Sequence, residues 1–341
     1  MNEIMQSMFD CLSHGNPVYL PSKFWEALNT KNLQQLEGEG LDNFKQTVAQ
    51  NYFTWVIGSA DQQFHYLLKH TNLFAWPAIL EGIFTHDPSF PLSRKQQREL
   101  IIFTRMLWKF SGKIDSEHLL ECIVEPIEGN PFRILLKGKL ISQDLANSVL
   151  EYYSIRENFK TPTCEKTTIC ELGAGYGRNA YVFLKALPNC KYIVIDIPPA
   201  LYISQHYLTS IFRDKKIFTF RPFDRFNDVE NEFNNADIAF LLPHQAEMLP
   251  EKSVDLFINI SSLHEMKIDQ IQAYFILIDK LTKGFFYTKQ WLVSHNPADG
   301  ITVIPKDYPV PSTWRQLYHR KAKVQTHFFE AMYFLGHEGT S

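Results

Sequence analysis

The sequence predicts an α/β fold in which a doubly wound, mostly parallel sheet follows a helical N-terminal region. From residue 167 onward, short apolar runs alternate with helical patterns, as in chains that build a parallel sheet. Before residue 160, helical patterns follow one another without strand-like alternation. At 167–187 an apolar run, a glycine turn and a helix are contiguous, which is typical of the first βα unit of a nucleotide-binding sheet.

The chain is predicted to contain two domains, because 341 residues exceed the usual size of one. We place a helical domain at 1–160, which we expect to form a substrate cleft or an oligomer contact. A Rossmann-like catalytic domain is placed at 161–341. The boundary is marked by Thr161-Pro162-Thr163.

Helices are predicted wherever apolar residues recur at helical spacing behind a capping residue. Ser93 and Gln96 form the clearest such start, a capping box. The predicted helices are 42–57, 61–69, 94–110, 116–124, 142–157, 178–187 and 200–212.

Strands are predicted at short apolar runs bounded by turn residues. They are 167–171, 191–196, 236–242, 254–260, 284–290 and 327–335, with an irregular strand at 217–220.

The composition of the chain limits the classes of partner and the cellular location that we expect. A formal net charge of −3 gives no general attraction to nucleic acid or anionic lipid. No apolar run approaches membrane-spanning length, and the first residues do not resemble an export signal, so we expect a soluble cytoplasmic protein. The five cysteines form no C-x-x-C pair, which disfavours disulfides and zinc. A homo-oligomer is left open.

The glycine turn separates two classes of cofactor. Gly173, Gly175 and Gly177 give G-x-G-x-G, whereas dinucleotide sites favour G-x-G-x-x-G, and here Arg178 stands at the third glycine's place. Glu171, just before the turn, would repel a pyrophosphate but accept from an amino group. Asp196 ends the next strand, where a carboxylate binds ribose hydroxyls. The pattern favours S-adenosylmethionine, with S-adenosylhomocysteine as product. The predicted cofactor-binding residues are Glu171, Gly173, Ala174, Gly175, Gly177, Asp196, Ile197, Pro243, His244, Gln245, Asn259 and Ile260.

A polar cluster follows the predicted strand 254–260. Methylation of an alcohol requires a base that removes the hydroxyl proton. His264 lies just beyond the strand, and the ordinary pKa of histidine, about 6.5, suits a base at neutral pH. Glu265 could orient His264, bind a sugar hydroxyl or bind a metal. His264 and Glu265 are therefore the predicted catalytic residues.

Five further residues are candidates for contact with the acceptor. Lys289 ends a predicted strand, and Trp314 and Arg315 begin a short helix predicted at 314–320 behind Ser312. Tyr176 and Arg178, in the glycine turn, complete the set. A divalent metal is not favoured, because Glu265, Asp224 and Glu247 are scattered.

These motifs resemble those of the bacterial sugar O-methyltransferases, a branch of the class I S-adenosylmethionine-dependent methyltransferases. The resemblance covers most of the chain. It rests on Pro21-Ser-Lys-Phe-Trp25, Phe44-Lys with Tyr52 and Trp55, Glu171-Leu-Gly-Ala-Gly-Tyr-Gly-Arg178, Asp196-Ile-Pro-Pro-Ala-Leu-Tyr202, Leu241-Leu-Pro-His-Gln245, Asn259-Ile-Ser-Ser-Leu-His-Glu-Met266, Tyr308-Pro-Val-Pro-Ser-Thr-Trp314 and Phe329-Glu330.

The resemblance implies a seven-stranded class I fold with its last strand antiparallel. It also implies methylation of a sugar hydroxyl on a surface glycan, a nucleotide sugar or a glycosylated natural product. Two alternatives stay open: a polyketide, peptide or lipid hydroxyl as acceptor, and a catalytically silent subunit that binds the cofactor. A nicotinamide dehydrogenase is disfavoured by the glycine spacing.

Overall fold

The computed structural model describes residues 3–52, 57–84, 87, 92–160 and 166–336. The predicted linker at 161–163 and Trp55 lie outside these ranges. None of the described helices is both long enough and apolar enough to cross a bilayer.

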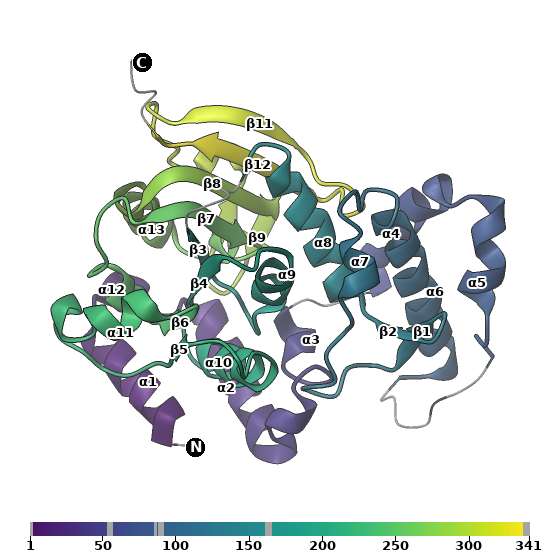
Figure 1. Ribbon diagram of the computed structural model, residues 1–341, viewed down its shortest axis with the longest axis horizontal. Coiled ribbons are helices and arrows are strands. Elements are labelled where there is room, and N and C mark those ends of the chain that lie inside the picture. Colours follow the sequence, from purple (N-terminus) through teal and green to yellow (C-terminus); the bar gives the residue numbers. More distant parts are fainter. Residues whose placement is uncertain (1–2, 53–56, 85–86, 88–91, 161–165, 337–341) are drawn as a thin grey trace.

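Among the described residues, eight strands form one sheet in the order β11-β12-β8-β7-β3-β4-β6-β5 (Figure 1). Neighbours from β5 to β8 run parallel, and β12 is antiparallel to both β8 and β11. The predicted fold class, with its antiparallel last strand, is confirmed, but the sheet has eight strands among the described residues and not the seven expected, because the short β5 adds an edge strand beside β6. The strands are β3 Thr167–Leu172, β4 Cys190–Ile195, β5 Ile217–Phe218, β6 Ile238–Leu241, β7 Val254–Ile260, β8 Thr282–Trp291, β11 Arg315–Lys321 and β12 Phe328–Phe334.

Strand β11 corrects a prediction. The segment 314–320 was expected to be a helix, but Arg315–Lys321 pairs with β12 along most of its length. Polar side chains at an exposed sheet edge hide the alternation that identifies a strand, so pairing with β12 decides the conformation.

Side chains alternate between two faces of the sheet, and helices cover both. Tyr192 and Val194 face α8 Gln143–Arg156, α9 Arg178–Ala186 and α10 Ala200–Ile211. Ile193 and Ile195 face α11 Glu230–Asn235, α12 Pro243–Ala246 and α13 Ile268–Leu281. Because strand side chains repeat every two residues, Glu171 lies on the α9 face between Cys170 and Leu172, which belong to the other core.

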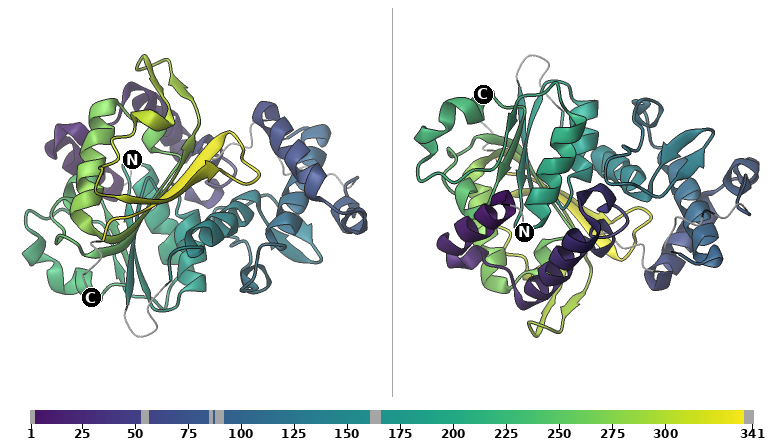
Figure 2. Two further views of the ribbon diagram at one scale, coloured as in Figure 1. Left: turned by 90° about the horizontal axis from the view of Figure 1, so that it is seen from above. Right: turned by 90° about the horizontal axis from the view of Figure 1, so that it is seen from below.

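The N-terminal part is helical, as predicted, and it lies in two places (Figures 1 and 2). The first helices (purple) lie beside the sheet, whereas α4 to α6 (blue) form a lobe at the far side. The elements are α1 Glu3–His14, η1 Pro17–Tyr19, α2 Lys23–Glu39, η2 Leu41–Asn43, α3 Ala49–Tyr52, α4 Ile57–His70, η3 Leu73–Ala75, α5 Trp76–Leu80, α6 Arg94–Ser111 and α7 Leu119–Cys122.

Two of the predicted N-terminal helices are shorter than expected. The described part of 42–57 contains η2, turns and α3 in place of one continuous helix. The helix is interrupted because the backbone amide of Lys45 donates to the Gly129 carbonyl and the Lys45 ammonium donates to the buried Glu125 carboxylate. At 116–124 only α7 forms, since the Asp115 carboxylate accepts from the amides of Leu119 and Leu120 and so starts the helix later.

A small hairpin also interrupts the helical region, where no strand was predicted. Its strands are β1 Ile134–Leu136 and β2 Lys139–Ile141, and Lys137 and Gly138 both have the positive φ of a tight hairpin turn. The remaining elements are η4 Phe226–Asp228, η5 Leu263–Glu265, β9 Ser294–Asn296, β10 Ile301–Val303 and η6 Pro305–Asp307.

Candidate active site

The glycine turn joins β3 to α9 and brings bare backbone to the carboxyl edge of the sheet. Gly173, Gly175 and Gly177 all have positive φ. A Cβ added at Gly173 would lie 2.4 Å from the Ser262 hydroxyl oxygen, so only glycine fits this close approach. The turn is therefore built against the loop that follows β7.

Asp196, at the end of β4, is tied to the turn. One carboxylate oxygen accepts from the Gly175 amide at 2.8 Å, and the other accepts from the Ile197 amide at 2.8 Å. Burial and, to a smaller extent, the nearby Glu171 carboxylate raise the pKa of Asp196 to about 7, against these two hydrogen bonds. Asp196 is thus held rigidly, with its charge poorly solvated.

A cavity of about 780 Å³, partly open to solvent, lies above the turn and is called here the glycine-turn cavity. Six of the predicted cofactor-binding residues line it: Gly173, Gly175, Asp196, Ile197, Pro243 and Ile260. Its other side is the N-terminal strap, residues 16–28, which contributes Tyr19, Leu20, Pro21, Ser22, Trp25 and Leu28. The strap includes the motif Pro21-Ser-Lys-Phe-Trp25.

The other predicted cofactor-binding residues lie next to this cavity rather than on its wall. Gln245 is fully buried, accepting from the Leu242 amide and donating to the Arg221 carbonyl. His244 faces Cys11, with its Nε2 atom 3.5 Å from the sulfur. Asn259 is buried beneath the β7 loop, and Ala174 and Gly177 belong to the turn itself.

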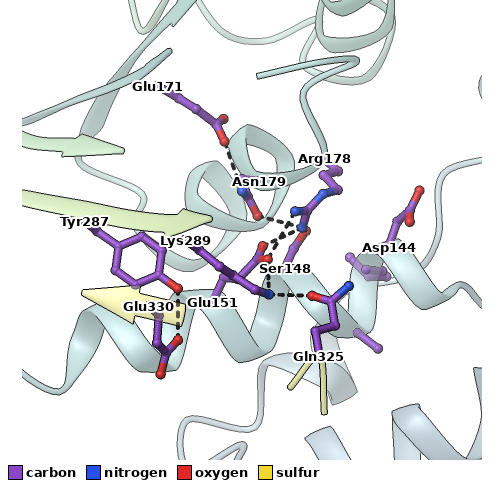
Figure 3. Close-up of polar contacts among 12 residues, drawn as sticks. Asp144, Ser148, Glu151, Glu171, Arg178, Asn179, Tyr287, Lys289, Gln325 and Glu330 are labelled. Atoms are coloured by element: carbon purple, nitrogen blue, oxygen red, sulfur yellow. Dashed lines mark hydrogen bonds and ion pairs between the residues drawn. The ribbon is translucent and has the colours of Figure 1, made fainter. Parts of the chain in front are cut away.

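Glu171 is buried and leads away from the turn into a polar network (Figure 3). It accepts from the Asn179 amide at 3.0 Å and from the Tyr192 hydroxyl at 2.8 Å. The Asn179 carbonyl oxygen in turn accepts from Arg178 at 3.2 Å. The amino-group role predicted for Glu171 stays a prediction.

A second cavity, called here the polar cavity, adjoins the first and has about 1100 Å³ of empty space, part of it open to solvent. Arg178 and Lys289, two predicted acceptor-contact residues, converge there on Glu151 (Figure 3). The Arg178 guanidinium donates to Glu151 at 2.6 and 3.2 Å, and the Lys289 ammonium donates at 2.8 Å. Burial alone would raise the pKa of Glu151, but Arg178 and Lys289 lower it to about 2.

Asp144 lines the same cavity. Its carboxylate accepts from the Tyr176 hydroxyl at 2.8 Å. Tyr176, which was predicted to contact the acceptor, does not itself line the polar cavity and is separated from it by Asp144. Burial raises the pKa of Asp144 to about 6, against the opposing charge of Arg178. Asp144 and Glu151 were not predicted, although 144, 148 and 151 share one face of a helix, which was the available signal.

The two cavities share one wall, formed by Asn51, Ile260, Ser261 and Glu265. Ser261 has a φ of 56°, an uncommon backbone conformation for a residue other than glycine. Glu265 also lines a third, outer groove, together with His264. Of the two predicted catalytic residues, only Glu265 reaches both main cavities.

His264 is held behind Glu265 by a chain of amides. The Leu172 carbonyl accepts from Asn259 at 2.9 Å, and the Asn259 oxygen accepts from the Gln290 amide at 2.5 Å. The Gln290 oxygen lies 2.8 Å from His264 Nδ1 and must accept there. The neutral imidazole therefore carries its proton on Nδ1 and a lone pair on Nε2, which lies 3.7 Å from a Glu265 carboxyl oxygen.

Burial shifts the two groups in opposite directions. It lowers the pKa of His264 to about 4, against the hydrogen bond with Gln290. It raises the pKa of Glu265 to about 8, with Asp196 adding to the effect. At pH 7 these shifts favour the neutral form of each group.

Trp314 and Arg315 lie away from both main cavities, contrary to their predicted contact with the acceptor. Trp314 is buried, stacks on Phe275 with ring centroids 5.6 Å apart, and donates to Asp279 at 2.8 Å. Arg315 is exposed on β11. Both predictions depended on the helix expected at 314–320. The strand formed instead places Arg315 at the exposed sheet edge, and Trp314, just before the strand, packs against α13.

Within the described ranges, no three His, Cys, Asp or Glu side chains gather as metal ligands would.

Comparisons with known proteins give structural similarity only. No protein-family model and no curated protein matches the chain. A SAM-dependent methyltransferase from Aquifex aeolicus is similar at 12% identity, with a TM-score of 0.34 over 55% of this chain and 89% of that one. A SAM-dependent methyltransferase from Leishmania major has 14% identity and a TM-score of 0.39 over 66% and 82%. A Burkholderia thailandensis 1,6-didemethyltoxoflavin-N1-methyltransferase, with S-adenosylhomocysteine bound, has 13% identity and a TM-score of 0.39 over 57% and 79%.

Proposed function

We propose that the protein is an S-adenosylmethionine-dependent O-methyltransferase that acts on a sugar hydroxyl. The observation that carries this is the wall shared by the glycine-turn cavity and the polar cavity. A donor in one cavity and an acceptor in the other would meet at Glu265 and Ser261. Transfer between two adjoining sites is the arrangement that a group-transfer reaction needs.

The charge of the glycine-turn cavity supports S-adenosylmethionine over a dinucleotide. Its walls include the carboxyl groups of Asp196 and Glu265, and no Lys, Arg or His among the described residues that line it. A pyrophosphate would have no cation to neutralise it there. A ligand with a sulfonium, an ammonium and a ribose diol suits such walls, with Asp196 placed to accept from the diol.

The walls of the polar cavity support a sugar acceptor. One side is aromatic, with Trp291 stacked on His327 at a ring distance of 6.0 Å and tilted against Phe328 at 5.0 Å. Asp144, Arg178 and the amides of Gln143, Asn147 and Gln325 also line it. Rings that carry hydroxyl groups match this combination of flat apolar surface and hydrogen-bonding side chains.

The chemistry asks little of the protein beyond position and proton removal. When bound, the cofactor supplies a methyl group on a positively charged sulfur. The acceptor oxygen would form the new O–CH₃ bond as the CH₃–S bond broke, and sulfur would keep the electron pair. The hydroxyl proton passes to the pair formed by Glu265 and His264, while the polar cavity holds the acceptor in line.

Calorimetric titration tests the cofactor first. Wild-type protein should bind S-adenosylmethionine and S-adenosylhomocysteine with micromolar affinity and should not bind reduced dinucleotide. Asp196→Ala should lose this binding. Asp228→Ala, which removes an exposed carboxylate paired with Arg225, should keep it. Dinucleotide binding alone would overturn the proposal.

An acceptor screen follows, with methyl transfer detected as S-adenosylhomocysteine released. Free sugars, nucleotide sugars and glycans should give turnover, whereas polyketide, peptide and lipid hydroxyls should not. Turnover only on the second group would keep the methyltransferase and reject the sugar. Tight cofactor binding with no turnover on either group would favour the silent subunit.

A further inference from the structure

Among the described residues, Glu265 is the one acid–base residue in the wall that the two main cavities share. The wall consists of Asn51, Ile260, Ser261 and Glu265 among the described residues. His264 is 3% exposed and lines the outer groove but neither main cavity. A hydroxyl in the polar cavity would therefore reach the Glu265 carboxyl group before it reached the imidazole.

The orientation of His264 fits a supporting role. Its Nδ1 proton is committed to Gln290, and its Nε2 lone pair faces Glu265 across 3.7 Å. An acceptor nitrogen on that side can stabilise a proton on Glu265 but cannot donate one. The fixed tautomer therefore favours a neutral, protonated Glu265 while the cavities contain no cofactor.

Few charges near Glu265 favour its ionised form. In the glycine-turn cavity it shares the walls with the Asp196 carboxyl and the phenols of Tyr19 and Tyr274. On the outer side are His264 and His295.

Across the polar cavity the charges compensate one another. Its titratable groups are Asp144, Glu151, Arg178, Lys289 and His327. Arg178 and Lys289 are both bonded to Glu151, so neither cation is dedicated to Glu265. A new positive charge in the glycine-turn cavity would be the strongest influence on Glu265.

We propose that Glu265, rather than His264, takes the acceptor's proton, and that Glu265 becomes ionised only when the positive sulfonium of S-adenosylmethionine enters the glycine-turn cavity. This inference rests on the proposed function, since it requires a sulfonium cofactor. His264 is then a positioning residue that receives no proton from the acceptor directly. The methyl donor creates the base that its own transfer requires.

The expected size of the effect is large enough to measure. Burial raises the pKa of Glu265 to about 8 in the free protein. An opposite charge within about 4–6 Å typically lowers a carboxyl pKa by roughly 1–3 units. Binding of the cofactor at pH 7 should therefore release a proton from Glu265. S-adenosylhomocysteine, which lacks the sulfonium, should leave Glu265 protonated.

Proton release on binding tests this without any acceptor. Both ligands are titrated by calorimetry at pH 7.0 in two buffers of different ionisation enthalpy, which gives the number of protons exchanged. Wild-type protein should release roughly 0.4–0.9 more proton with S-adenosylmethionine than with S-adenosylhomocysteine. Asp196 lines the same cavity and its carboxyl pKa is also raised, so the sulfonium acts on it too, and variants must separate its contribution from that of Glu265.

Variants assign the proton to its group. Glu265→Gln should remove most of the difference between the ligands and leave only the part due to Asp196, whereas His264→Gln and the matched control Asp144→Asn should retain the full difference. Glu265→Ala repeats the test with a smaller side chain. Circular dichroism and melting curves establish that each variant is folded.

Each contrary result has a distinct meaning. Equal proton release by the two ligands in wild type would overturn the inference and leave the proposed function intact. A difference that survives in Glu265→Gln but is lost in His264→Gln would return the base to His264. If wild type bound neither ligand, the proposed function itself would fail.

Discussion

Arg178 and Glu151 form a buried two-point ion pair that joins α9 to α8, with N···O distances of 2.6 and 3.2 Å. Arg178 begins the helix after the glycine turn, whereas Glu151 belongs to the helical region that precedes the sheet. The pair therefore fixes the N-terminal part against the candidate active site, and Lys289 joins β8 to the same carboxylate.

Breaking this pair should be costly. Glu151→Gln removes the anion that Arg178 and Lys289 share, and removing one partner of a buried pair typically costs roughly 3–5 kcal/mol. Chemical denaturation measures the free energy of unfolding. Glu157→Gln, at the end of the same helix, removes an exposed partner of Arg320 and should cost less than about 1 kcal/mol. Equal losses in the two variants would contradict a special role for the buried pair.

Gly173 should tolerate no side chain. Gly173→Ala would impose a Cβ at a φ of 71° and 2.4 Å from the Ser262 hydroxyl oxygen. The variant should lose cofactor binding and melt at a lower temperature. Gly38→Ala is the matched control, because Gly38 lies in α2 with open space around it. Alanine there should raise stability by roughly 0.5–1 kcal/mol. A Gly173→Ala protein that binds normally would refute the close-approach argument.

The local parts of the fold could be predicted from the sequence. Strands such as Val254–Ile260 are apolar runs with clear ends, and the capping box at Ser93 starts α6 as expected. The segment 314–320 could not be predicted, because its conformation depends on pairing with β12. The buried Lys45 likewise breaks an expected helix through its bond to Glu125, 80 residues away.

The candidate site divides in the same way. The glycine turn and Asp196 lie within one βα unit, so spacing along the chain was sufficient to find them. The polar cavity draws Glu151 from α8, Lys289 from β8 and Gln325 from the loop before β12. Residues so far apart in sequence meet only through the fold. For the same reason, the sequence could not show that Glu265, and not His264, lines both main cavities. That difference depends on the orientation of the short 3₁₀ helix η5.

The N-terminal strap should slow ligand release. The Gln270 side-chain amide donates to the carbonyls of Val18 at 3.0 Å and Leu20 at 2.7 Å, and both residues belong to the strap. Gln270→Ala removes both bonds, each worth about 1 kcal/mol, so the dissociation rate of S-adenosylhomocysteine should rise roughly 5- to 30-fold. Stopped-flow displacement measures this rate. Gln34→Ala, exposed on α2, is the control and should leave it unchanged.

Glu265 should make the free protein less stable as pH rises. Its carboxyl pKa is about 8 in the folded protein, compared with an ordinary value of 4.5. Between these values the folded state binds more protons than the unfolded state, so the free energy of unfolding falls with increasing pH. Glu265→Gln cannot titrate, and the variant should gain stability relative to wild type from pH 5 to pH 8. Asp196, shifted in the same direction, remains in the variant, so the decline should become shallower rather than disappear.

Urea denaturation across this pH range measures how steeply the free energy of unfolding falls, with Glu230→Gln, at an exposed position of α11, as the control. Parallel curves for wild type and Glu265→Gln would show that Glu265 is already ionised in the free protein, and the cofactor could then not be what ionises it.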